Sequence, residues 1–78
     1  MSNTLANIQK GPMYTIASVA DENNELKSSL ESLGFIEGEA VKLYRHSWLG
    51  SPIAVELRGS VFAMRVEDAS KIKVKEQS

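Results

Sequence analysis

The sequence predicts a mainly β protein that forms a small, partly open barrel of five to six strands with one inserted α-helix. Three observations support this fold class. Short segments rich in β-branched and aromatic residues recur along the chain, glycine-containing turns separate them, and one segment with a helical period interrupts them. The 78 residues suffice for one compact domain, which we expect to span residues 1–78 with an ordered core of about residues 4–75.

The inserted helix is expected over about residues 24–33. Its leucines recur at i, i+4 and i+7, which places them in one apolar stripe facing the core: Leu26, Leu30 and Leu33. Asn23 or Asn24 can accept backbone N–H bonds at the helix start, and Gly34 can adopt the left-handed conformation that ends many helices. Phe35 and Ile36 follow directly, so we expect both to pack beneath the end of the helix.

The strands are expected where apolar residues alternate with polar ones. They cover about residues 4–5, 13–19, 39–46, 53–58, 62–65 and 72–74. Ile16 and Val19 have opposite parity in the second of these strands, which predicts a β-bulge between them. We also expect a two-residue hairpin turn centred on Gly59 and Ser60, and a short helical turn at about residues 67–70.

The last strand is flanked and interrupted by lysines at alternate positions, Lys71, Lys73 and Lys75. Alternation directs these side chains outward, where their charge discourages pairing with another chain. We therefore expect this strand at an edge of the sheet.

Composition excludes several classes of protein. Nine basic and ten acidic side chains give a net charge of −1, whereas non-specific nucleic-acid binding usually needs a positive excess, so we expect no nucleic-acid partner. The chain has no cysteine, hence no disulfide and no thiolate metal site. It shows no signal-peptide pattern and no apolar run of the roughly 20 residues that a membrane span needs, so we expect a cytoplasmic protein without direct membrane insertion.

No catalytic constellation is recognisable in the sequence. His46 is the only histidine that could act as the base for a serine nucleophile. No serine lies in the G-x-S-x-G context of such nucleophiles. The phosphate-binding motif G-x-x-x-x-G-K-[ST] does not occur either. We therefore expect a protein that docks onto another protein and is not an enzyme.

Several short motifs occur in a recognisable order. They are Leu33-Gly34-Phe35-Ile36-Glu37-Gly38, then Trp48-Leu49-Gly50-Ser51-Pro52-Ile53, then Arg58-Gly59 and Ala63-Met64-Arg65. In this order and spacing the chain resembles the FeoA family, the ferrous-iron transport protein A family, over about residues 4–75. It departs from the family pattern at Glu37, which replaces a proline, at Trp48, which replaces a proline or small residue, and at Ser51, which replaces an aspartate.

The resemblance implies a fold and a partner. The family's domain is an SH3-like barrel, in agreement with the strand pattern, and it also occurs as the C-terminal domain of metal-responsive repressors. The family's role implies a small accessory protein that docks on the cytoplasmic part of the ferrous-iron transporter FeoB, at the inner face of the membrane, and modulates its assembly or GTP-linked activity. Two alternatives stay open: a nucleic-acid-binding barrel with cations such as Arg45 and Arg58 on one face, and a direct metal sensor or chaperone.

The candidate docking surface is the loop between two core strands that carries the only tryptophan of the chain: Trp48, Leu49, Gly50, Ser51 and Pro52. An exposed tryptophan in such a loop is a typical interface anchor. The alternative is that Trp48 folds back over the barrel and only packs against it. If exposed, Trp48 and Leu49 form an apolar patch that a solitary monomer seldom keeps, so weak self-association is a further expectation.

The weak candidate metal ligands are His46, Glu37 and Glu39. Ferrous iron in enzymes is commonly held by two histidines and one carboxylate, a set that this chain cannot supply. We therefore expect no resident cofactor. The alternative is a weak Fe²⁺ site that another subunit completes.

Overall fold

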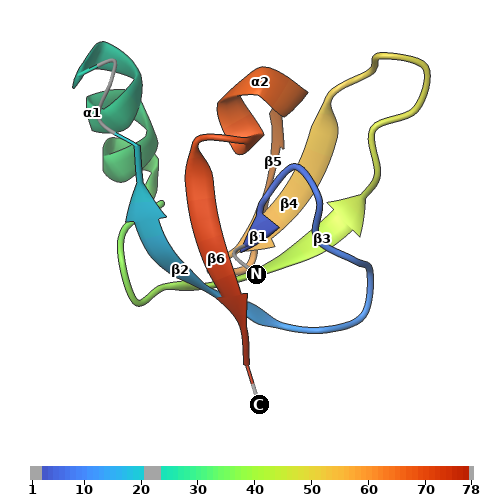
Figure 1. Cartoon of the computed structure of the whole chain (residues 1–78), viewed down its shortest axis with the longest axis horizontal. Helices are drawn as coiled ribbons and strands as arrows, with labels where there is room; N and C mark the ends of the chain where they lie inside the picture. The colour runs from blue at the N-terminus through green and yellow to red at the C-terminus, as the bar shows by residue number, and fades with distance from the viewer. Residues whose placement is uncertain (1–2, 21–23, 78) are drawn as a thin grey trace.

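The computed structural model describes residues 3–20 and 24–77 and confirms the predicted fold class. One antiparallel six-stranded sheet curls into an open barrel with the strand order β1-β6-β2-β3-β4-β5 (Figure 1). The strands are β1 (Asn3–Thr4), β2 (Tyr14–Val19), β3 (Ala40–Arg45), β4 (Ile53–Leu57), β5 (Ser60–Met64) and β6 (Ile72–Glu76). The described chain also contains two helices, α1 (Asn24–Leu33) and α2 (Val66–Ala69). Neither of these helices is long and apolar enough to cross a membrane.

The apolar core lies inside the curled sheet. The alternate apolar residues of β3 and β4 face this core, as predicted, and each is at most 3% exposed: Val41, Leu43, Ile53, Val55 and Leu57. The ladder between β2 and β6 shifts register between Ile16 and Ser18, where the sequence predicted a bulge. Because of this shift, Ile16 and Val19 both reach the core despite their opposite parity.

Helix α1 has the predicted bounds and ends at the predicted glycine. The Gly34 amide donates to the carbonyl three residues earlier and the Phe35 amide to the carbonyl five residues earlier, both at 3.0 Å, which is the Schellman pattern. Gly34 has a φ of 111°, a backbone conformation that favours glycine. Of the two predicted N-caps, Asn24 is the first helical residue, and Asn23 lies outside the described residues.

Two predictions about apolar residues near this helix are wrong. Leu33 is 51% exposed and Ile36 is 42% exposed, although both were expected in the core. Within α1 only Leu30 is buried. The Schellman turn at Gly34 explains the difference, because it redirects the chain inward and brings Phe35, which is fully buried, into the space below the helix.

Two predictions about the strands also need correction. The ladder pairs Leu57 with Ser60, so the hairpin turn is centred on Arg58 and Gly59 and lies one residue earlier than predicted. Their φ values of 54° and 83° identify a type I′ turn, whose twist matches that of the flanking strands. Strand β6 is not an edge, because it lies between β1 and β2, and the edges of the sheet are β1 and β5.

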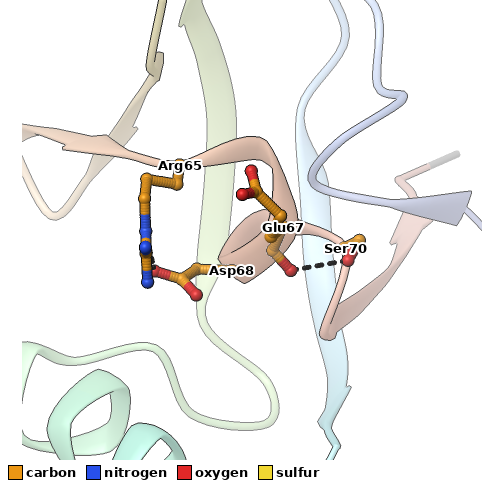
Figure 2. A network of polar contacts seen from close by, with 4 residues as sticks. All are labelled: Arg65, Glu67, Asp68 and Ser70. Carbon is orange, nitrogen blue, oxygen red and sulfur yellow. Dashed lines mark hydrogen bonds and ion pairs between the residues drawn. The ribbon is translucent and has the colours of Figure 1, made fainter. Parts of the chain in front are cut away.

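The short helical turn, α2, begins one residue earlier than predicted. Figure 2 shows its polar contacts: the Arg65 Nε atom lies 3.4 Å from Asp68 Oδ2, and the Ser70 hydroxyl donates to the Glu67 carbonyl at 2.6 Å. Ala69 is fully buried and anchors the turn on the core. Helix α2 thus ends β5 and redirects the chain into β6.

Candidate docking site

The predicted docking loop joins the end of β3 to the start of β4 and extends away from the barrel (Figure 1). Trp48 and Leu49 at its tip are 75% and 86% exposed, more than any other large apolar side chain of the described residues. Trp48 therefore does not fold back over the barrel. The neighbouring Ser51 and Pro52 are exposed as well.

Hydrogen bonds hold the tip of this loop in one conformation. The Ser51 amide donates to the Trp48 carbonyl at 3.0 Å, and the Ser51 hydroxyl accepts from the Trp48 amide at 2.9 Å. The Ser47 hydroxyl donates to the Ser51 carbonyl. These bonds close a type I′ turn in which Leu49 and Gly50 have φ values of 52° and 80°. The apolar tip is thus pre-organised, and a partner that docked on it would meet a lower entropic cost.

Leu49 is an unusual residue for its position. A left-handed conformation costs a residue with a side chain about 1–2 kcal/mol, and type I′ turns favour Asn, Asp or Gly at this site. The sequence places Leu49 in the loop but carries no signal for its backbone conformation. Strained backbone with an exposed side chain is typical of functional sites, which adds to the case for this loop.

A concavity adjoins the loop, and no sequence pattern indicated it. It has a volume of about 620 Å³ and is lined by Lys10, Gly11, Lys42, Leu43, Tyr44, Arg45 and Glu56. The Lys42 ammonium lies 4.0 Å from the Glu56 carboxylate, so the charged lining consists of this pair and two further cations. Tyr44 is half exposed and could have been found from its outward parity in β3.

The candidate metal ligands do not come together within one chain. Glu39 precedes β3 and His46 follows it, so the strand between them separates the two by about 20 Å. Glu37 lies in the turn before Glu39, whose carboxylate is 3.9 Å from the Arg58 guanidinium. Within residues 3–20 and 24–77, no three His, Cys, Asp or Glu side chains are grouped to hold a metal ion. A Fe²⁺ site completed by another subunit stays a prediction.

Sequence comparison covers nearly the whole chain. The model of the FeoA domain matches residues 3–76. This chain belongs to the FeoA family. In the structure of this FeoA domain, the motifs that indicated the family form the end of α1, the docking loop and the β4–β5 hairpin. No curated protein matches its sequence.

Solved structures of other FeoA proteins share the SH3-like fold. FeoA from Chlorobium tepidum is 29% identical with a TM-score of 0.85, over 97% of this chain and 71% of that one. FeoA from Stenotrophomonas maltophilia is 28% identical with a TM-score of 0.82, over 94% of this chain and 89% of that one. That protein was solved with zinc and is described as an SH3 domain protein and a candidate activating factor of ferrous-iron transport. A manganese-dependent transcriptional repressor has the same fold at 16% identity, with a TM-score of 0.88 over 97% of this chain and 42% of the repressor.

Proposed function

We propose that this FeoA domain is a non-catalytic accessory protein of ferrous-iron uptake. It docks through the Trp48–Pro52 loop on the cytoplasmic part of the transporter FeoB and modulates the assembly or GTP-linked activity of that transporter. The observation that carries the proposal is the loop tip, where two large apolar side chains are exposed on a turn that hydrogen bonds hold in place.

The loop tip has the chemistry of an interface anchor. Tryptophan is enriched among the few residues that dominate binding energy, and burying a leucine side chain contributes about 1.5–3 kcal/mol. The adjoining concavity adds cations from Lys10 and Arg45, so an apolar segment of FeoB with acidic residues would suit both surfaces.

The iron pathway is supported by membership of the FeoA family and by the description of the Stenotrophomonas maltophilia protein. GTP hydrolysis is assigned to FeoB, because the sequence of the accessory chain has no phosphate-binding motif. Binding to FeoB would also recruit the domain to the inner face of the membrane.

The test is a titration of the domain with the cytoplasmic portion of FeoB, with and without nucleotide and Fe²⁺. Calorimetry measures the affinity, and the emission of Trp48, the only tryptophan of the chain, reports its burial. We expect Trp48→Ala to weaken binding more than about tenfold, or about 1.4 kcal/mol. Leu33→Ala is the matched control, because Leu33 is also exposed but lies at the end of α1.

Two results would contradict the proposal. Absence of binding under all of these conditions would exclude FeoB as the partner. Equal binding by the wild type and Trp48→Ala, with a loss in Leu33→Ala, would exclude the loop as the docking surface.

A further inference from the structure

Strand β5 is an edge of the sheet that lacks the usual protection of an edge. Within the described part of the chain, β4 is its only neighbouring strand (Figure 1). Its five residues, Ser60–Met64, include no charge and no proline, and they pair with β4 without a register shift. Natural edge strands are commonly blunted by lysine, proline, a bulge or short length. The opposite edge strand, β1, is protected by its short length of two residues. Strand β5 has none of these protective features.

The register shows which backbone groups of β5 point outward. The two-residue turn joins the Leu57 carbonyl to the Ser60 amide, so Leu57 and Ser60 form a hydrogen-bonded pair. Bonded and non-bonded pairs alternate along an antiparallel ladder, which leaves the N–H and C=O groups of Val61 and Ala63 directed away from β4. Both residues are exposed, Val61 by 49%.

We infer that this edge pairs with the same edge of a second copy of the chain, so that an antiparallel β5–β5 ladder joins the two sheets. A two-fold axis at Phe62 pairs Val61 with the partner's Ala63 and Ala63 with the partner's Val61. Each pair exchanges the hydrogen bonds that the free edge leaves open. The interface is isologous, because the same surface serves both copies.

The side chains of β5 fit this arrangement. On the outer face, the two-fold axis sets each Val61 beside the partner's Ala63, so that a larger apolar side chain meets a smaller one. Phe62 points inward and is held against Phe35, with ring centroids 5.3 Å apart and an interplanar angle of 71°. It therefore stays in its own core and does not obstruct the ladder.

Length and charge favour a second copy over an unrelated segment. The hairpin turn bounds β5 on one side and α2 on the other, so the free edge accepts a strand of about the five residues that β5 itself has. The two-fold axis brings Arg58 of one copy, whose exposed guanidinium lies 3.9 Å from Glu39 of its own chain, toward α2 of the other, whose first turn carries Glu67 and Asp68. Arg65 offsets only one of these two negative charges.

The test is sedimentation equilibrium of the full chain from micromolar to millimolar concentration. We expect the apparent mass to rise from 8.6 kDa toward twice that value. Val61→Lys places a charge on the edge and should lower the association constant at least about tenfold, or about 1.4 kcal/mol. Met13→Lys is the matched control, because it adds the same charge at an exposed apolar residue that precedes β2, away from β5 in the sheet, and it should associate like the wild type. Leu49→Lys tests the alternative that the docking loop mediates self-association.

A second variant and a second measurement distinguish a loss of association from a folding defect. Ala63→Pro removes an N–H that the β4 ladder does not use, so the monomer should keep its circular dichroism spectrum while association is lost. In the wild type, hydrogen exchange at the Val61 and Ala63 amides should slow as the concentration rises.

Several outcomes would overturn the inference. One is a wild-type chain that stays at 8.6 kDa at millimolar concentration, and another is association that Leu49→Lys abolishes and Val61→Lys leaves intact. If both variants dissociate, slowed exchange at Val61 and Ala63 on association upholds the β5 ladder, and unchanged exchange refutes it. Protection of these amides only after another protein is added would also refute a second copy and identify a segment of that protein as the occupant.

Discussion

At the scale of single residues, Leu49 has a backbone conformation that opposes folding stability and a side chain that the proposed docking would use. Its φ of 52° is unfavourable for leucine, whereas asparagine tolerates it and is preferred at this position of a type I′ turn. We expect Leu49→Asn to raise the free energy of unfolding by about 0.5–1 kcal/mol and to weaken binding to FeoB. Urea denaturation and the FeoB titration measure the two effects.

Leu49→Ala is the control for this prediction, because it removes the apolar side chain but keeps a residue that disfavours positive φ. It should weaken binding without a gain in stability. If Leu49→Asn binds FeoB as tightly as the wild type, the leucine side chain has no part in docking.

Glu37 lies at a position of the backbone that suits proline. The Glu39 amide donates to the Ile36 carbonyl at 3.1 Å and Gly38 has a φ of 94°, which defines a type II turn with Glu37 at its second position. Proline, which the family pattern has here, fixes φ near the value that this position requires. We expect Glu37→Pro to stabilise the fold by about 0.4–1 kcal/mol through the entropy of the unfolded chain.

Thermal unfolding measures this effect, because 1 kcal/mol corresponds to a shift in Tm of about 4–8 °C in a domain of this size. Glu37→Ala is the control, since it removes the carboxylate without restricting φ, and it should leave Tm nearly unchanged. A lower Tm for Glu37→Pro would show that Ile36 cannot adopt the extended conformation required before proline.

At the scale of elements, sequence patterns predicted the features that short-range interactions determine. The leucine spacing and Gly34 predicted α1, and the alternation in β3 and β4 predicted their buried faces. The centre of the β4–β5 turn was missed because the prediction placed glycine first, whereas the chain places Arg58 first with positive φ and Gly59 second. The position of β6 was missed because pairing with β1 and β2 is a long-range property that alternating lysines do not encode.

The candidate site also has features that the sequence indicated and features that it did not. The glycine, serine and proline of the Trp48–Pro52 loop indicated a surface connection but left open whether Trp48 packs back over the barrel, and the structure shows it exposed. The strain at Leu49 is a property of φ that no sequence pattern indicated. His46 and Glu39 flank opposite ends of β3, so their proximity in the sequence does not bring the two side chains together.

At the scale of the whole molecule, stability depends on one apolar core and little on ion pairs. The ion pairs Lys42–Glu56, Arg58–Glu39 and Arg65–Asp68 are all solvent-exposed to some degree, and such pairs contribute about 0–1 kcal/mol each. The core instead joins residues from nearly every element, and Phe35 is among its largest fully buried side chains. Phe35 connects the end of α1 with β5 through its edge-to-face contact with Phe62.

We therefore expect Phe35→Ala to destabilise the fold by about 3–5 kcal/mol, because it removes a buried aromatic side chain and leaves a cavity. A domain of this size has a net stability of only about 4–12 kcal/mol, so the variant should be partly unfolded or unfold at much lower urea. Phe62→Ala is the matched control, since the Phe62 ring is only partly buried and its loss should cost less. A loss below about 1 kcal/mol for Phe35→Ala would show that α1 and the strands do not share one cooperative core.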